Sequence, residues 1–132
     1  MFFEYFSLED GYAAFRPKGQ FTFDEAVQVV DEALAYCRDN KIRRLLVDIT
    51  GMTGFPPPST LQRFFFGSKW AETAGGKVAL SVVAPAEMID PEKIGVTVAT
   101  NRGLQTDVFT AESDAVDWLR GLSRPSNAGS PG

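Results

Sequence analysis

Few side chains in this sequence could carry out chemistry. The 132 residues include no histidine and one cysteine, Cys37. Without histidine there can be no Ser-His-Asp or Cys-His nucleophile, no imidazole metal ligand and no imidazole base. Carboxylates, lysines, tyrosines and hydroxyl groups remain, and no spacing among them indicates a nucleophile beside its base. The sequence therefore predicts that the protein is not an enzyme.

Asp48 has the most unusual setting of the acidic residues, because it is the lone acid in the apolar run Leu45–Ile49. Lost solvation raises the pKa of a carboxylate buried in a strand unless N–H donors compensate. The enzyme alternative would use Asp48, but the sequence indicates no second carboxylate as its partner. We favour a structural role, in which Asp48 accepts hydrogen bonds from the loop after the strand.

Two further motifs are weaker candidates for a site. The GMTG motif at 51–54 lacks the Lys and Ser/Thr of a phosphate-binding loop and the third glycine of a dinucleotide fingerprint. Cys37 has no second cysteine for an internal disulfide and occupies a helical apolar position, so we interpret it as a small buried side chain. We expect neither a cofactor nor a metal ion.

Composition and charge limit the class of protein. Hydrophobic residues make up 44% of the chain and charged residues 23%, which is typical of a globular domain. The net charge is −4 and the 13 Lys and Arg residues are scattered, so we expect no nucleic-acid partner. No apolar run approaches the roughly 18 residues of a membrane span, and the N-terminus has acids where a signal peptide has basic residues. We predict a cytoplasmic protein without stable membrane insertion.

The elements that position these residues are predicted from hydrophobic periodicity and turn signals. Asp10-Gly11 is typical of a hairpin turn, and Thr22 and Glu25 have the spacing of a capping box. The run Leu45–Ile49, with its succession of branched side chains, indicates a strand buried on both faces. The predicted strands span 2–8, 12–16, 45–49, 77–84 and 106–110, and the predicted helices span 23–40, 59–74, 90–101 and 112–122.

This order of elements predicts a single α/β domain over residues 1–122. We expect a mixed, mostly parallel sheet of about five strands with an N-terminal antiparallel hairpin and about four helices. Each strand-helix-strand crossover should be right-handed, which packs the helices over the sheet. Residues 123–132 have nothing to bury and are predicted to form a disordered tail.

The predicted helix 59–74 is apolar on two sides. At about 100° per residue, Phe66 and Trp70 project nearly opposite a second stripe. That stripe consists of Leu61, Phe64, Phe65, Ser68 and Ala71. The sheet can cover only one of these sides. If the large rings on the other side stay in water, the protein loses several kcal/mol of hydrophobic stabilisation, at about 25 cal/mol per Å² of apolar surface. We expect Phe66 and Trp70 to contact a second molecule, unless the helix is rotated and they belong to the core.

The loop before this helix adds to the candidate surface. It follows the central strand at its carboxyl end, where open α/β sheets usually place their sites. It holds Phe55 and three consecutive prolines, and Ser59 or Thr60 can cap the helix. The candidate binding residues are therefore Phe55, Pro57, Phe66 and Trp70.

The order of elements, with LLVDITGMTGF at 45–55 and DVFTAESDAVDWL at 107–119, resembles the STAS domain family and in particular its small stand-alone SpoIIAA-like branch. The resemblance covers residues 2–122. It implies a non-catalytic module of about this length that often works through protein partners. Some relatives have a fold similar to that of the CRAL-TRIO lipid-transfer proteins.

The sequence departs from the family at one loop. In the anti-sigma factor antagonists, the family pattern after the central strand is Asp-Ser-Ser-Gly, and phosphorylation of a serine there switches partner binding. Aligned on LVDITGMT, these positions are Pro56, Pro57, Pro58 and Ser59. Proline has no hydroxyl group, so the switch is absent from its usual position. Ser59 or Thr60 would be the phosphoacceptor only if a kinase accepted a shifted site.

Two binding functions follow as hypotheses. The first is a regulatory protein–protein interaction module that forms a homodimer or binds another protein through Phe66 and Trp70. The second is a carrier or sensor of an apolar, lipid-like small ligand held between helix 59–74 and the sheet. The second hypothesis requires an enclosed apolar cavity of at least about 300 Å³.

Overall fold

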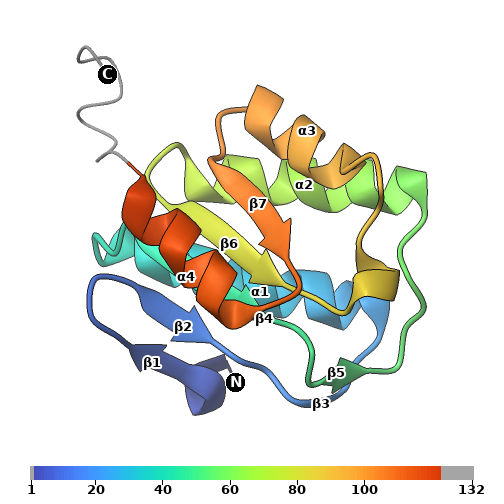
Figure 1. The fold of residues 1–132 in the computed structure, drawn as a ribbon, viewed down its shortest axis with the longest axis horizontal. Helices are drawn as coiled ribbons and strands as arrows, with labels where there is room; N and C mark the ends of the chain where they lie inside the picture. Colours follow the sequence, from blue (N-terminus) through green and yellow to red (C-terminus); the bar gives the residue numbers. More distant parts are fainter. Residues whose placement is uncertain (1, 123–132) are drawn as a thin grey trace.

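A computed structural model describes residues 2–122 of the chain (Figure 1). The predicted tail, 123–132, lies outside the described residues. The helices are α1 (Phe23–Asp39), α2 (Thr60–Ala74), α3 (Ile94–Asn101) and α4 (Glu112–Gly121), with short 3-10 helices η1 (Phe2–Tyr5) and η2 (Ala86–Met88). The strands are β1 (Phe6–Leu8), β2 (Ala13–Phe15), β3 (Gly19–Gln20), β4 (Arg44–Asp48), β5 (Met52–Thr53), β6 (Ala79–Val83) and β7 (Thr106–Phe109). Within residues 2–122, no helix has both the length and the apolar character needed to cross a membrane.

The main sheet has five strands in the order β1-β2-β4-β6-β7. β1 and β2 form an antiparallel hairpin, with Phe6 opposite Phe15 and Leu8 opposite Ala13. The pairs β2–β4, β4–β6 and β6–β7 are parallel, and α1, α2 and α3 make the crossovers between them. The predicted α/β fold, with a mixed sheet and four helices, is therefore confirmed.

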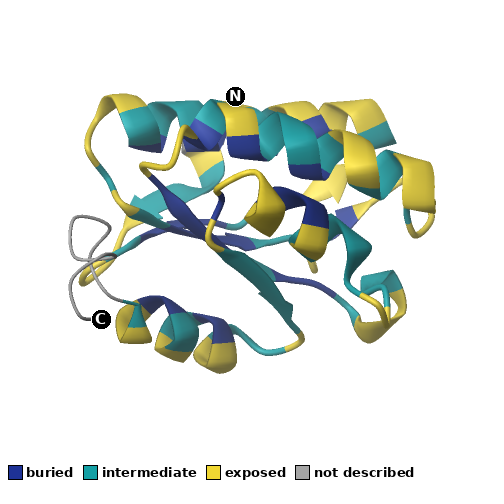
Figure 2. Cartoon of the chain, turned by 90° about the horizontal axis from the view of Figure 1, so that it is seen from above, coloured by how far each residue is buried: buried dark blue, intermediate teal, exposed yellow. Residues whose placement is uncertain are grey.

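Helices cover both faces of this sheet, which gives three layers (Figure 2). On one face, Leu45 and Val47 of β4 share a core cluster with Leu34 of α1. On the other face, Leu46 of β4 packs in a second cluster with Leu119 of α4. All five side chains are 0% exposed. β4 is thus covered on both sides, as its unbroken apolar run predicts.

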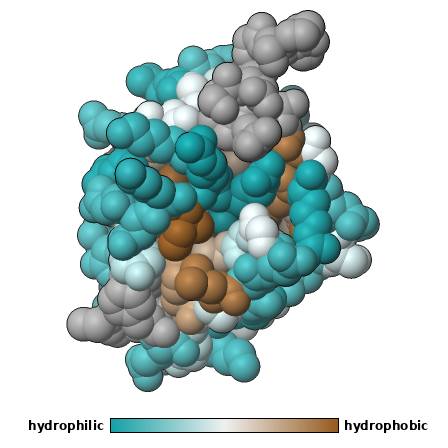
Figure 3. Space-filling view, turned by 90° about the vertical axis from the view of Figure 1, so that its left-hand side faces the viewer, coloured by the Kyte–Doolittle hydropathy of each residue, from teal (hydrophilic) through white to brown (hydrophobic). Residues whose placement is uncertain are grey.

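The parallel strands all point toward the same end of the molecule (Figure 1). Beyond their carboxyl ends lie the loops 49–59 and 84–93, which lead to α2 and α3. Figure 3 shows the opposite end, where hydrophilic residues surround an apolar strip. Because open α/β sheets usually bind ligands beyond the carboxyl ends of their strands, the loops 49–59 and 84–93 stand where a site is expected.

Two capping boxes determine where the helices α1 and α2 begin. The Glu25 N–H donates to Thr22 Oγ1 at 3.1 Å, and the Thr22 N–H donates to Glu25 Oε1 at 2.8 Å. Ser59 and Gln62 make the same reciprocal pair, with distances of 3.1 and 2.9 Å. Each box satisfies two N–H groups that the first helical turn leaves unpaired. α1 therefore starts at the predicted residue, and α2 starts at Thr60, one residue after the predicted start, with Ser59 as its N-cap.

Two elements, β1 and α3, start four residues later than the sequence predicts. Residues 2–5 form the 3-10 helix η1 instead of a strand, because β2 offers only three residues for pairing and ends before Pro17, which has no N–H to donate. α3 starts at Ile94 and not at Asp90. Lys93 has a φ of 50°, which interrupts the helix, and the Asp90 carboxylate accepts the Ile94 N–H at 2.8 Å.

A short parallel ladder between β3 and β5 has no counterpart in the sequence prediction. It pairs Gly19 with Met52, and the Phe21 N–H donates to the Thr53 carbonyl at 2.8 Å. The ladder ties the loop after β4 to the segment that leads into α1. Gly54 has a φ of 107°, and a Cβ at this position would clash with the Phe21 carbonyl oxygen. The ladder therefore depends on glycine at position 54.

We expect Gly54→Ala to destabilise the protein more than Gly11→Ala. Both glycines have a positive φ, 107° and 88°, whereas a Cβ at Gly11 meets nothing within 4 Å. Positive φ alone costs about 1–2 kcal/mol for an L-residue. Because the clash at Gly54 adds to this cost, Gly54→Ala should lower the free energy of unfolding in urea by at least about 1 kcal/mol more than Gly11→Ala. Equal effects would show that the β3–β5 contact is not formed.

Candidate functional site: the two apolar sides of helix α2

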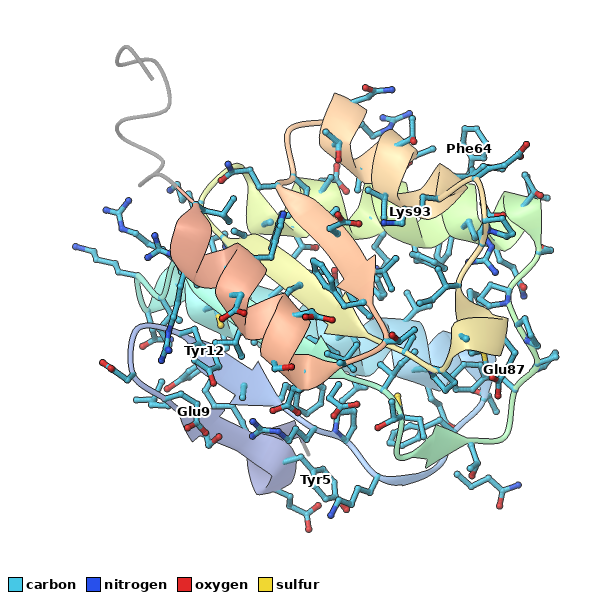
Figure 4. The ribbon with its side chains drawn as sticks, in the orientation of Figure 1. Tyr5, Glu9, Tyr12, Phe64, Glu87 and Lys93 are labelled. Atoms are coloured by element: carbon cyan, nitrogen blue, oxygen red, sulfur yellow. The ribbon has the colours of Figure 1, made fainter. Side chains whose placement is uncertain are left out.

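Helix α2 is apolar on two sides, but its rotation is the reverse of the predicted one. The three large side chains of the stripe expected against the sheet are exposed, with fractions of 79% for Leu61, 49% for Phe64 and 53% for Phe65. We call these three residues the outer patch. Phe64 projects away from the body of the protein in Figure 4. Phe66 and Trp70, which were expected to face a second molecule, point into the chain.

Small residues explain this rotation. Gly67, Ala71 and Ala74 are the buried residues of α2. Ala71, which was predicted in the stripe opposite Trp70, therefore belongs to the inward side of the helix. A Cβ on Gly67 would lie 2.9 Å from the carbonyl oxygen of Gly95 in α3, so the two helices approach closely here. Only the side with small residues permits this approach. The spacing of Gly67, Ala71 and Ala74 is the sequence signal that could have revealed the rotation.

Phe66 and Trp70 make contacts within the chain. Their ring centroids are 4.7 Å apart, and the Phe66 ring lies 6.3 Å from the ring of Phe23 in α1. The Trp70 Nε1–H donates to the Val27 carbonyl of α1 at 3.1 Å. Both side chains are half-buried, and Trp70 packs against the core cluster. They therefore join α2 to α1, so the orientation predicted for them is wrong.

The outer patch lies between two shallow grooves of different charge. At the N-terminal end of α2, the groove contains Leu61 and Phe65 and is flanked by Asp24 of α1. At the C-terminal end, Phe65 and Ser68 are accompanied by Lys69, Glu72 and, from α3, Arg102. The patch thus has the carboxylate of Asp24 near its start, and two cationic groups with one carboxylate, Glu72, near its end.

The loop residues of the predicted site are divided by the structure. Phe55 is half-buried and, with Phe66 and Trp70, lines a cavity below α2. Pro57 is exposed and has no place in this cavity. Ser59 is the N-cap of α2 and Thr60 its first residue, and both are exposed.

The cavity lies between the sheet and the layer of α1, α2 and α3. Its volume is about 120 Å³. That is less than the roughly 300 Å³ at the lower end for ligand pockets, so the prediction of a cavity for a lipid-sized ligand is wrong in size. Its walls are mostly apolar, with Arg63, Asp90, Lys93, Thr106 and Asp107 as the polar exceptions. Lys93 lies between α3 and β7 in Figure 4, and its ammonium group pairs with Asp107 at 2.8 Å.

Asp48 lies at the end of β4, outside this cavity. Its Oδ1 accepts the Thr50 N–H at 2.9 Å and the Thr50 hydroxyl at 2.6 Å, which is the pattern of the structural role. The structure also gives Asp48 a neighbouring carboxylate, Glu112 at the start of α4. Glu112 is held by Arg16 of the segment after β2, with two hydrogen bonds of 2.9 and 2.7 Å. This cluster of Arg16, Glu112 and Asp48 therefore links the segment after β2, the start of α4 and the end of β4.

Charge and burial shift the pKa values of two groups. The Arg16 guanidinium holds the pKa of Glu112 below its ordinary value, with a smaller contribution from a hydrogen bond with Asp48. Burial raises the pKa of the Cys37 thiol to about 12. The thiol is thus protonated and unreactive at neutral pH. Among residues 2–122, no group of three or more acidic or cysteine side chains is arranged to hold a metal ion.

Known structures share this arrangement of strands and helices. The chain is similar to the crystal structure of an anti-sigma factor antagonist from Mycobacterium paratuberculosis, with a TM-score of 0.58 and 15% identity over 87% of this chain and 91% of that chain. It is also similar to an uncharacterised protein of the DUF3478 family with a SpoIIAA-like fold from Shewanella loihica PV-4. For that protein the TM-score is 0.50 and the identity 18%, over 86% of this chain and 90% of the other.

These similarities define the fold class: the chain has a SpoIIAA-like α/β fold, shared with an anti-sigma factor antagonist. The predicted resemblance to SpoIIAA-like STAS proteins is thereby confirmed at the level of the fold. No family model and no curated protein matches the sequence. One fold can serve many functions, so the fold alone does not assign a function to this chain.

The Arg16–Glu112 pair makes the stability of the protein depend on pH. Because the pKa of Glu112 is lower in the folded chain than its ordinary 4.5, the ionised form stabilises the fold above about pH 4.5, and this contribution is lost as the pH falls through the folded value. The side chains are 37% and 33% exposed, so we expect Glu112→Gln to cost only about 0.5–1 kcal/mol at neutral pH.

Urea denaturation of the wild type and Glu112→Gln between neutral and acidic pH measures this dependence. The difference in unfolding free energy between the wild type and Glu112→Gln should shrink toward zero as the pH falls below 4.5, the ordinary pKa of glutamate. Glu92→Gln, at an exposed position, is the matched control and should show no such change. A difference that is constant with pH would mean that Glu112 is not held ionised by Arg16.

Proposed function

We propose that this chain is a non-catalytic regulatory module that works by binding protein, and that its contact surface is the outer patch of α2. The observation that supports this proposal is the exposure of three large apolar side chains, Leu61, Phe64 and Phe65, on consecutive turns of one helix. Contiguous exposed apolar surface of this kind marks interaction sites, and aromatic residues dominate the energy of such contacts. The fold of an anti-sigma factor antagonist supports the regulatory class.

The partner we propose is a second copy of the chain. Leu61 lies four residues before Phe65, and Lys69 lies four residues after it. If two α2 helices pair antiparallel about a two-fold axis beside Phe65, the start of the patch in one copy lies against its end in the other. Asp24, at the acidic end of one copy, then faces Lys69 of the other. The present partner of Lys69 is Asp31 at 3.9 Å, a long contact that leaves the ammonium group free to re-pair. Ser68, small and half-buried, allows the helices to approach.

The arrangement around α2 also bears on phosphorylation. We propose that the module works without a phosphoacceptor at the usual position, where Pro56, Pro57 and Pro58 stand. Ser59 and Thr60 are the alternative acceptors. The Ser59 hydroxyl already accepts the Gln62 N–H at 3.1 Å, and a phosphate there would sit at the positive N-terminus of α2, next to the outer patch.

The cytoplasm remains the predicted location of the protein.

Self-association can be measured by sedimentation velocity at high micromolar concentration. We expect the wild type to be a dimer and Phe65→Asp to weaken association by at least about tenfold, because a carboxylate would be buried at the centre of the contact. Leu8→Asp is the matched control, since Leu8 is 71% exposed on β1 and should leave association unchanged. A wild-type chain that stays monomeric at this concentration refutes the homodimer.

The proposed pairing has its own test by charge exchange. Asp24→Lys and Lys69→Asp should each weaken the dimer, because each places like charges opposite one another. The double variant restores opposite charges and should recover most of the lost affinity. If the double variant is as weak as the sum of the single variants, the antiparallel arrangement is wrong.

A further inference from the structure

The cavity below α2 has an apolar floor that crosses three strands. Val47 of β4, Val82 of β6 and Val108 of β7 are in register across the sheet, and all three line the cavity. Val82 is half-buried although β6 lies inside the sheet, with a strand on each side. Its remaining exposure is therefore toward the cavity and not toward the outer surface. Apolar side chains that face an unfilled space lose packing contacts, which a ligand of the right shape would restore.

The other walls come from the helices. Phe66 and Trp70 of α2 stand on one side, and Gly95 and Ala99 of α3 on another. The lack of a side chain at Gly95 keeps this part open, since a Cβ there would lie 3.2 Å from the Phe66 ring. The walls are therefore aromatic on one side and nearly flat on the other, a shape that suits a thin apolar group.

Among the charged residues that line the cavity, Arg63 is a cation without an ion-pair partner in the described residues. Arg63 is a half-buried residue, and its guanidinium group donates long hydrogen bonds, of 3.4 and 3.3 Å, to the Met88 carbonyl. Among the described residues it has no carboxylate within 4.0 Å. By contrast, Lys93 is neutralised by Asp107 at 2.8 Å, and the Asp90 carboxylate accepts the Ile94 N–H. A partly desolvated arginine with such weak partners favours an anion, and carboxylates match its two parallel N–H groups.

We infer that this cavity binds a small carboxylic acid, with its aromatic or short aliphatic body between Trp70 and the valine floor and its carboxylate on Arg63. The volume of about 120 Å³ limits the body. An engineered apolar cavity of about 150 Å³ holds benzene, so this somewhat smaller space sets an upper limit of roughly six carbon atoms for the enclosed body and excludes a long acyl chain. This site lies on the opposite side of α2 from the outer patch, and it is independent of the proposed dimer.

The two tryptophans provide a direct readout of binding. Trp70 lines the cavity, whereas Trp118 packs on the α4 side of the sheet against Phe109. In nitrogen-15 spectra of the full chain, titration with benzoate or hexanoate should shift the Trp70 indole N–H signal and leave the Trp118 signal in place. Benzyl alcohol and hexanol have bodies of similar size without the charge, and they should bind at least about tenfold more weakly.

Substitution separates the two parts of the site. Arg63→Gln should weaken the binding of benzoate at least about tenfold and leave the binding of benzyl alcohol unchanged, because only the carboxylate uses the guanidinium group. Arg43→Gln, at an exposed position before β4, is the matched control and should have no effect. Val108→Phe fills the cavity from the edge strand and should abolish the Trp70 shift for both compounds.

Several results would overturn the inference. One is the absence of any Trp70 shift with benzoate and hexanoate up to their solubility limits. Others are equal shifts of Trp70 and Trp118, equal affinities for benzoate and benzyl alcohol, and an unchanged benzoate affinity in Arg63→Gln. If Val108→Phe fails to fold, the Arg63→Gln comparison still decides the outcome. The same measurements can be made in the Phe65→Asp variant, which weakens the proposed dimer and leaves the cavity walls intact. Each result is therefore independent of whether the chain dimerises.

Discussion

The close approach of α2 to α3 is the constraint on which the rest of this structure depends. It requires the side of α2 that carries Gly67, Ala71 and Ala74 to face inward, because a Cβ on Gly67 would already press on the Gly95 carbonyl oxygen at 2.9 Å. Trp70 follows these small residues into the helical layer and reaches the Val27 carbonyl. The outer patch is then left in solvent. The exposed outer patch and the cavity are therefore two consequences of one rotation.

Much of the fold could be predicted from local sequence. The unbroken run at 45–47 identifies a strand buried on both faces, and β4 is the centre of the sheet. Thr22 with Glu25 marks the start of α1, because a capping box satisfies its N–H groups within one turn. Gly75, with a φ of 59°, marks the end of α2. These signals are interactions between neighbours in the sequence, which is why the sequence shows them.

The features that escaped prediction depend on distant residues. The rotation of α2 was misjudged because its aromatic residues occur on both sides, and only the fit to α3 decides which side is inside. The Arg16–Glu112 pair joins residues 96 positions apart, and it gives Asp48 the neighbouring carboxylate that sequence reasoning could not assign. The unpaired Arg63 becomes notable only in the structure, where Asp107 pairs with Lys93 and Asp90 accepts the Ile94 N–H. The exposed apolar side of α2 was therefore predicted on the wrong side of the helix.

The rotation of α2 is tested most directly by comparing the unfolding free energies of Trp70→Ala and Phe65→Ala, measured at concentrations too low for association. The account predicts that Trp70→Ala lowers the free energy of unfolding by about 3 kcal/mol or more, because it removes a packed ring and a hydrogen bond. Phe65→Ala should change it by less than about 0.5 kcal/mol, as expected for an exposed residue. A larger loss for Phe65→Ala than for Trp70→Ala would contradict the account.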